Sequence, residues 1–385
     1  MIHLTDELQD ERKNGFIRMK EMKESTGKKV VGTFCTYTPL ELVEAAGAVA
    51  VSLCGSSEAG ISDAEKVLPP SICPLIKSSY GLAATDKCPY FYFADMILAE
   101  TTCDGKKKMY ELMGEIKPTH VMQLPQGLSS DKAIDFWENE IYRAKDAIEK
   151  TLGATITTEK LREAIHLHNE RRKAILSAYE IGKLKPMPLS VKDLLTVLDY
   201  TTYSFDTAEA TERTNAVVRE VYDRIEKEGN NDPEGPRILI TGCPSSGVRE
   251  KLIYAIEELG GKIVSYENCG GPRCQKDLVD ETIDPYRALA EKYMRISCSV
   301  MSPNDDRLDF MKQMVEDYSV DGVIEVVLHG CHTFAIEAYK VQRFVKNELN
   351  LPYLCLNVNF SESDKGQLRT RISAFLEMIS ERKMD

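Results

Sequence analysis

Cysteine is the residue type through which this sequence is best equipped to do chemistry. The chain of 385 residues contains eleven cysteines, and none of them forms a Cys-x-x-Cys pair. The nearest two are Cys269 and Cys274. Zinc ribbons and bacterial ferredoxins use closely spaced pairs, so any metal ligands here must converge from distant loops. Thiolates are soft ligands, and such a set favours an iron–sulfur cluster.

Most of the cysteines fall where predicted strands end. Eight lie at or just past a carboxyl end, or in a neighbouring loop: Cys35, Cys54, Cys73, Cys103, Cys243, Cys269, Cys298 and Cys331. Parallel sheets bind ligands at this edge, and cysteines that only fill a core would not favour it. Several also precede helices, whose N-termini stabilise thiolates. We therefore expect ligands here, and expect Cys88 and Cys355, which lie elsewhere, to be packing residues.

The elements that carry these cysteines follow the same order in both halves of the chain. In the first half, apolar strands over 30–35 and 48–53 flank a short helix. In the second half, strands over 238–241 and 263–266 flank a helix predicted over 248–259. Strands that alternate with helices predict a parallel sheet covered on both faces. The expected fold class is α/β, with two Rossmann-like parallel-sheet domains and a helical middle segment.

The length and the turn residues divide the chain into three expected parts. These are an N-terminal α/β domain over 1–129, a helical middle segment over 130–232 and a C-terminal α/β domain over 233–385. Residues 230–236, rich in Asn, Pro and Gly, read as the linker before the last part.

The middle segment reads as a charged helical scaffold. Thr157 or Thr158 is expected to cap one of its helices, and Ser190 opens a second helix with a pattern that resembles a capping box. His166 and His168 lie in this segment. We expect both to be surface or structural residues and not catalytic ones.

Composition limits the kinds of partner and compartment. The formal net charge is −12, which argues against nucleic acid or an anionic membrane surface as a partner. No apolar run approaches the roughly 20 residues that cross a bilayer, and the N-terminus lacks the apolar core of a signal peptide. We therefore expect a cytoplasmic protein. In that reducing compartment the cysteines are not expected to form disulfides.

The sequence lacks a nucleotide-binding loop of a known type. Residues 241–247 place two glycines five positions apart, but Val248 and Arg249 stand where a phosphate loop needs lysine and a hydroxyl residue. A Gly-x-Gly-x-x-Gly fingerprint is also missing. If low-potential electrons are needed, another protein must supply them.

Three motifs give the sequence a family resemblance. At residues 73–81, 102–108 and 329–332 it resembles the 2-hydroxyacyl-CoA dehydratase and benzoyl-CoA reductase superfamily, with supporting matches at 39–47 and 366–375. The resemblance covers nearly the whole chain. Within the superfamily it is most similar to the double-cubane cluster proteins, which are marked by extra cysteines, here Cys35, Cys243, Cys269 and Cys298.

The resemblance implies a ligand set. Cys73, Cys103 and Cys331 would bind one cubane, and a sulfide would join it to a second, so that six cysteines serve one unit. The strand-end argument favours Cys35, Cys243 and Cys269 for the second cubane, with Cys298 next and Cys54 in reserve. The sequence does not decide among these.

The resemblance also implies a function and partners. The protein would be a homodimeric iron–sulfur reductase that acts on small molecules. Its electrons would come from a separate dimeric ATPase that carries its own iron–sulfur cluster. Acids near strand ends are candidate proton donors, chiefly Glu325 and His332, with Glu267 and His329 beside them. A solvated loop position explains each of them equally well.

Three other functions remain open from the sequence. The chain could be a 2-hydroxyacyl-CoA dehydratase component with one four-iron cluster and an unlike partner subunit. It could also be a cluster carrier or electron-storage protein without a substrate, or a structural zinc protein. Iron content separates the first from the reductase, because a double cubane needs roughly eight irons per chain and a single cubane roughly four.

Overall fold

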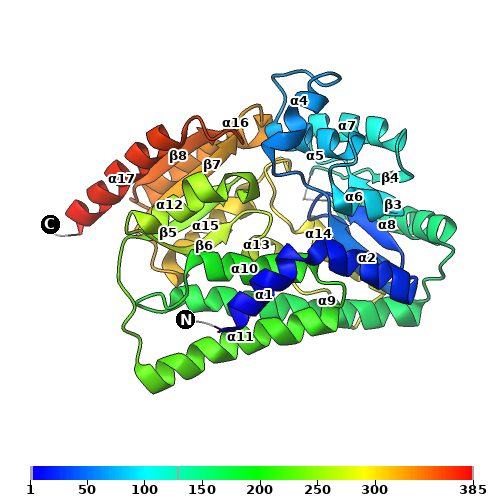
Figure 1. The fold of residues 1–385 in the computed structure, drawn as a ribbon, viewed down its shortest axis with the longest axis horizontal. Coiled ribbons are helices and arrows are strands. Elements are labelled where there is room, and N and C mark those ends of the chain that lie inside the picture. The colour runs from blue at the N-terminus through cyan, green and yellow to red at the C-terminus, as the bar shows by residue number, and fades with distance from the viewer. Residues whose placement is uncertain (1–2, 128–129, 384–385) are drawn as a thin grey trace.

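The computed structural model describes residues 3–127 and 130–383 and confirms the predicted α/β class. The described residues form two parallel sheets, each of four strands (Figure 1). The first sheet has the order β2 (Val49–Ser52), β1 (Val30–Thr33), β3 (Met96–Glu100), β4 (Thr119–Met122). The second has the order β6 (Lys262–Glu267), β5 (Arg237–Gly242), β7 (Gly322–Leu328), β8 (Tyr353–Val358). The strand order relative to the chain is the same in both sheets, so the repeat in the sequence is a repeat of architecture.

Helices flank each sheet to form a lobe. The first lobe contains α2 (Gly15–Thr26), α3 (Leu40–Ala45), α4 (Ile61–Ala64), α5 (Pro74–Ala84), α6 (Pro89–Phe93) and α7 (Asp104–Gly114). The second lobe contains α12 (Tyr254–Glu258), α13 (Pro272–Gln275), α15 (Asp305–Asp317), α16 (His332–Arg343) and α17 (Lys365–Arg382). Within the described part of the chain, no helix has the length and apolar character needed to span a bilayer.

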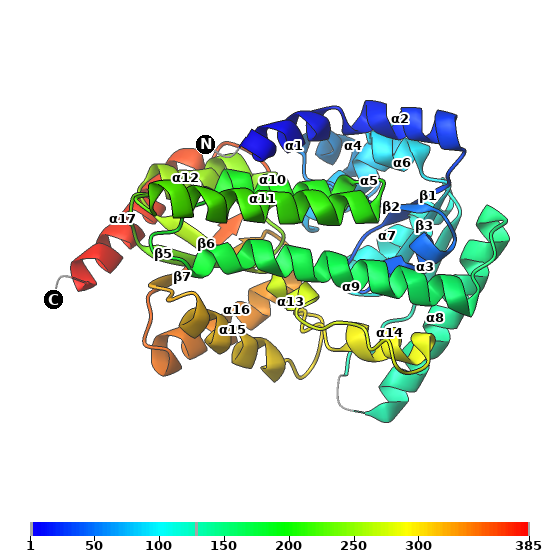
Figure 2. The same ribbon diagram turned by 90° about the horizontal axis from the view of Figure 1, so that it is seen from below.

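The middle of the chain is helical, as predicted. It contains α8 (Asp131–Leu152), α9 (Thr158–Glu180), α10 (Val191–Tyr203) and α11 (Thr207–Glu228), and α1 (His3–Lys13) packs on α10. Figure 2 shows α9 running beneath both lobes, and it contacts α3 of the first lobe and α13 of the second. The predicted caps are present: the Thr157 side chain accepts from the Lys160 amide, and Ser190 accepts from the Asp193 amide.

One segment of the second half of the chain packs on the first lobe. Helix α14 (Pro285–Met294) contacts α8 and α9. Buried apolar residues between 274 and 301 share one core with β1, β3 and α3 of the first lobe. The two lobes are therefore joined by apolar packing as well as by the chain.

Burial explains why the strands of the second sheet read as continuous apolar runs. All six residues of β5 and all seven of β7 are buried, since helices cover both faces of a parallel sheet.

The helix predicted over 248–259 is broken into three pieces. A 3₁₀ turn (Ser246–Val248) leads into a π-helical turn (Arg249–Ile253), and only α12 is regular. The widened turn presents Arg249 to Asp199 of α10. Turns of this kind frequently occur at functional sites, and hydrophobic periodicity does not reveal them.

Candidate functional site

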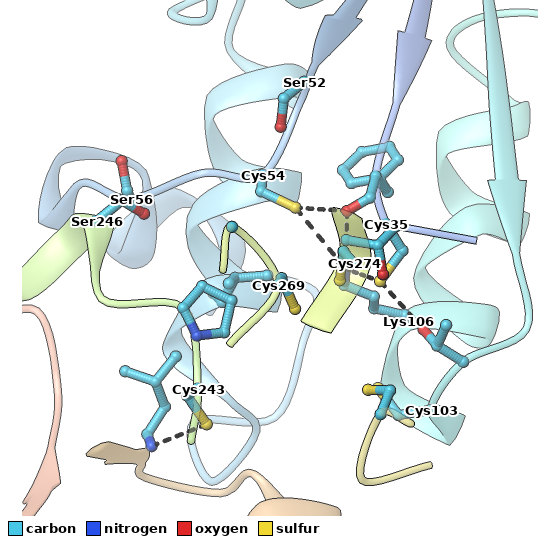
Figure 3. Close-up of a pocket in the computed structure, with 18 of the residues that line it drawn as sticks. Cys35, Ser52, Cys54, Ser56, Cys103, Lys106, Cys243, Ser246, Cys269 and Cys274 are labelled. Carbon is cyan, nitrogen blue, oxygen red and sulfur yellow. Dashed lines mark hydrogen bonds between the residues drawn. The ribbon is translucent and has the colours of Figure 1, made fainter. Parts of the chain in front are cut away.

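The carboxyl ends of the strands of both sheets face one cavity of about 840 Å³. Its wall includes nine of the eleven cysteines, several of them labelled in Figure 3: Cys35, Cys54, Cys73, Cys103, Cys243, Cys269, Cys274, Cys298 and Cys331. The other two, Cys88 and Cys355, do not line it. The strand-end argument thus predicted where the thiols gather.

Three of these cysteines stand immediately before a helix. Cys73, Cys103 and Cys331 are the N-cap residues of α5, α7 and α16. The N-terminus of a helix carries a partial positive charge, which favours the thiolate over the thiol. The N-termini of three helices therefore meet the cavity wall.

Two of the helix-capping thiols also meet a strand-end thiol. Hydrogen bonds from Cys243 and then Cys73 lower the pKa of Cys331 to about 3. The hydrogen bond to Cys331 and burial raise the pKa of Cys73, and burial and Cys331 raise the pKa of Cys243. Cys73, Cys243 and Cys331 thus form one contact group, which holds a single negative charge most readily.

Glycines set the backbone on either side of this contact group. Gly242 has φ +97°, and a Cβ there would meet the Val326 carbonyl oxygen at 2.2 Å. Gly330 has φ +69°, and a Cβ would meet the Ser71 oxygen at 2.5 Å. Both positions need glycine, and each directly precedes a cysteine of the group.

A second group of thiols surrounds a buried lysine. Lys106 Nζ lies 3.4 Å from Cys35 Sγ, 3.8 Å from Cys54 Sγ and 3.2 Å from the Phe34 oxygen (Figure 3). Burial raises the pKa of Cys35 to about 12, although Lys106 opposes that change. Burial lowers the pKa of Lys106, but Cys35 and Cys54 outweigh it, so the pKa lies well above its ordinary value. Lys106 therefore stays a cation among the thiols.

The second lobe contributes thiols opposite this lysine. Burial raises the pKa of Cys269, and the neighbouring Cys298 and Cys35 raise it further. Burial likewise raises the pKa of Cys298. Tyr37 Oη lies 2.5 Å from the Ile296 oxygen, to which it donates, and so ties the first lobe to the loop that carries Cys298.

The donor set fits a cluster better than a single ion. No three His, Cys, Asp or Glu side chains among the described residues stand close enough to hold one metal ion. The thiols instead surround a wide space, and buried soft sulfur donors suit an iron–sulfur core with several irons.

All seven expected ligands line the cavity, but their contacts divide them differently from the expectation. Cys243 contacts Cys73 and Cys331, whereas the sequence argument placed it with Cys35 and Cys269. Cys54, the ligand candidate held in reserve, lies beside Lys106. Cys274, which is not among the expected ligands, also lines the cavity.

The candidate proton donors occupy different surroundings. His332 lines the cavity and is exposed. Glu325 does not line it: the carboxyl is buried, accepts from Tyr353 and lies 3.6 Å from Arg307. Glu267 is buried and paired with Arg273 and Arg307. Neither carboxyl is placed to reach a molecule in the cavity.

One buried carboxyl group close to Cys35 and Lys106, although not in the cavity wall, escaped sequence reasoning. Glu100 ends β3, is fully buried, and accepts from the Tyr37 amide and the Thr38 hydroxyl. Burial raises its pKa to about 7. A glutamate at the end of the apolar run Met96–Glu100 was the available signal.

The middle segment also takes part in the site. His168, Arg171 and Arg172 of α9 line the cavity, although this helix was expected to be scaffold. His166, in contrast, is exposed and lies beside Glu281.

Comparison with known proteins gives matches along nearly the whole chain. The family model described as "2-hydroxyglutaryl-CoA dehydratase, D-component" matches residues 35–379. An Escherichia coli (strain K12) protein named "Putative dehydratase subunit YjiM" is 48% identical over 374 residues, which cover 97% of each chain.

More distant relatives carry more specific names. The (R)-phenyllactyl-CoA dehydratase beta subunit of Clostridium sporogenes is 27% identical, over 94% of each chain. A benzoyl-CoA reductase subunit of Thauera aromatica is 21% identical, also over 94% of each chain. Dehydratases and a reductase thus both occur among the similar proteins, and the names describe subunits.

Proposed function

Because the chain belongs to the 2-hydroxyglutaryl-CoA dehydratase D-component family, we propose that it is an iron–sulfur reductase with a double-cubane cluster. In this proposal thiolates of both lobes hold two four-iron units joined by a sulfide, and a small molecule is reduced in the cavity. A separate dimeric ATPase with its own cluster supplies the electrons to a cytoplasmic homodimer. The main support is the gathering of nine thiols of both lobes around one cavity.

The contacts suggest how the ligands divide. Cys73 and Cys331 serve one cubane with Cys103, as the family resemblance implies, or with Cys243, which they contact. Cys35 of the first lobe and Cys269 and Cys298 of the second lobe lie close together where the two lobes meet, which we call the seam. They are the candidates for the other cubane.

The chain's own residues prepare the cavity for negative charge. When bound, the cluster would supply one-electron reduction at low potential. The N-termini of α5, α7 and α16 and the buried Lys106 place positive charge around it, which stabilises thiolate and sulfide. His332, at the cavity wall, is the candidate that remains for proton delivery.

Iron content and visible absorbance of protein purified without air test the proposal. We expect roughly eight irons per chain. Cys331→Ala should lose most of the iron and the absorbance, because its thiol joins the contact group and caps α16. Cys355→Ala is the matched control, since Cys355 lies in β8 outside the cavity. Equal iron content in the two variants, or a colourless wild type, would contradict the assignment.

The relatives' names favour a second candidate, a dehydratase component that acts with an unlike subunit. That function predicts about four irons per chain and activity only after a second subunit is added. A homodimer with about eight irons that hydrolyses ATP with its activator only when substrate is present supports the reductase. ATP hydrolysis that no tested substrate changes supports a carrier instead.

A further inference from the structure

The cavity has a basic wall as well as a thiol wall. Among the cationic side chains that line it are Arg171 and Arg172 from α9 and Lys292 from α14, and we call these three the basic wall. They belong to helices that pack against each other, and the thiols come mainly from strand ends and loops. The same cavity therefore offers sulfur donors and fixed positive charge.

Among the residues that the structure describes, one member of the basic wall pairs with a carboxylate. Arg172 pairs with Glu41, and Tyr293 Oη donates to the other oxygen of that carboxylate at 2.8 Å. Glu44 accepts from Thr207 at 2.6 Å and lies 3.8 Å from His168 Nε2. Glu41 and Glu44 are therefore both engaged, and Asp277, which also acts on Lys292, pairs with Lys276.

Arg171 and Lys292 are basic side chains without an ion pair among the described residues. Arg171 Nη2 donates to the Thr201 oxygen at 2.7 Å, and Lys292 Nζ donates to the Cys274 oxygen at 3.1 Å. Lys292 is buried and lies 4.2 Å from the centre of the Tyr293 ring. Backbone carbonyls and an aromatic ring only partly replace a counter-ion.

The pKa shifts of Arg171 and Lys292 are also those of basic groups that lack a counter-ion. Burial, and then Arg172, lower the pKa of Arg171 to about 10 and that of Lys292 to about 7. A bound anion would raise both, since an opposite charge favours the charged form. The Arg249–Asp199 pair, also in the cavity wall, is bidentate and adds no free charge.

We propose that the basic wall binds the carboxylate of a small organic acid and holds it beside the thiols. The flat guanidinium of Arg171 matches a carboxylate with two parallel hydrogen bonds, and Lys292 adds a point charge. An uncharged acyl carbonyl at this position would leave both basic side chains without a counter-ion. The cavity must hold an inorganic core as well, which favours a small ligand. This inference deepens the proposed function, because it names the class of substrate for the same site.

Binding to the full-length protein, purified without air, tests the inference with D-lactate as the probe. Calorimetry should show saturable binding to the wild type, and Arg171→Gln should weaken it about tenfold or more, since a charge-assisted contact is lost. Lys292→Met should weaken it as well. Arg219→Gln is the matched control, because Arg219 is an exposed arginine of α11 that pairs with Glu212. It should bind like the wild type.

Two further ligands decide the chemical class. D-Lactoyl-CoA carries the same group as a thioester, and inorganic phosphate carries charge without a carboxylate. The inference holds if Arg171→Gln weakens D-lactate selectively. It is overturned if D-lactate does not bind, if Arg171→Gln leaves its affinity unchanged, or if the thioester or phosphate binds more tightly than the acid.

The same samples separate this inference from the proposed function. Iron is measured on each preparation before titration. Full iron content without D-lactate binding overturns the basic-wall inference alone. Arg171-dependent binding to protein that cannot be loaded with iron overturns the reductase proposal alone.

Discussion

At the scale of single residues, charge inside the cavity is the feature that most affects chemistry. Lys106 is buried and lies within 3.4 Å of Cys35 Sγ. A buried cation stabilises negative charge nearby more strongly than an exposed one, because water screens it little. Lys106 should therefore help the protein to hold an electron-rich core.

Replacing this lysine should lower the reduction potential of the bound cluster. For Lys106→Met we expect a shift on the order of 50 to 100 mV to more negative values, from the loss of one unit charge several ångströms away. A redox titration followed by electron paramagnetic resonance measures it. Lys108→Met, which removes an exposed lysine paired with Glu111, should leave the potential unchanged. A common shift in both variants would show that only the overall charge matters.

Glu100 gives a prediction for pH. Burial raises its pKa from 4.5 to about 7, so the folded state favours the neutral carboxyl. The contribution of the neutral Glu100 carboxyl to the free energy of unfolding is fully present below pH 4.5. It is lost as the pH rises to about 7. Glu100→Gln removes that loss, and from pH 5 to 8 it should gain up to about 3 kcal/mol relative to wild type. This gain is measured from the unfolding midpoints of the iron-free protein at pH 5 and pH 8. The exposed Glu111→Gln variant is the control. If the stability of Glu100→Gln and that of wild type changed equally with pH, the prediction would be contradicted.

Sequence reasoning about single residues located the side chains whose place depends on their position along a strand. It failed for side chains whose surroundings depend on residues far away in the sequence. The cavity cysteines follow strand ends, which the apolar pattern reveals. Arg172 and its partner Glu41 lie 131 positions apart in the sequence, on helices α9 and α3, which meet only in the folded protein. Glu325 is expected near a strand end but lies in the middle of β7, where Tyr353 and Arg307 enclose its carboxyl.

At the scale of elements, strand–loop–helix connections place the thiols. Cys331 follows Gly330 at the end of β7 and caps α16. The left-handed backbone at Gly330 brings the loop against the Ser71 oxygen, next to Cys73. The predicted strands of this lobe are present, whereas the helix over 248–259 is interrupted by a π-helical turn that starts at Arg249.

Gly330→Ala should therefore displace Cys331. The added Cβ would meet the Ser71 oxygen at 2.5 Å, in addition to the strain of φ +69°. We expect loss of most of the iron. Gly47→Ala is a matched control, since Gly47 has φ +70° but nothing within 4 Å of the added Cβ. It should cost only about 1 to 2 kcal/mol of stability and keep its iron. Equal iron in both variants would mean that this close contact does not position the thiol.

At the scale of the whole molecule, several separate segments of the chain pack across the seam between the lobes. Helix α9 spans both lobes, and α14 and the loop to Met301 pack in the core of the first lobe. The sequence predicted two Rossmann-like lobes, yet could not show this return of the second half to the first. The apolar pattern of a sequence indicates which residues are buried, but it does not indicate which core they join.

Tyr37 is the residue through which the closure of the seam can be tested. Its ring is fully buried, and its hydroxyl donates to the Ile296 oxygen and accepts from the Cys298 amide at 3.4 Å. Tyr37→Phe leaves both backbone groups without this partner, at a cost of about 1 to 3 kcal/mol. Because the loop that carries Cys298 would be held less firmly, we expect a lower unfolding midpoint and faster bleaching of the cluster in air.

The two readouts distinguish a local defect from an opened seam. Tyr222→Phe, at an exposed position of α11, should change neither the midpoint nor the bleaching rate. A lower midpoint with unchanged bleaching would mean that the Tyr37 hydrogen bonds stabilise the core without restricting access to the thiols. Faster bleaching in Tyr37→Phe alone would identify the contact between the first lobe and the Cys298 loop as a barrier to oxygen, because no cavity-lining thiol has been changed.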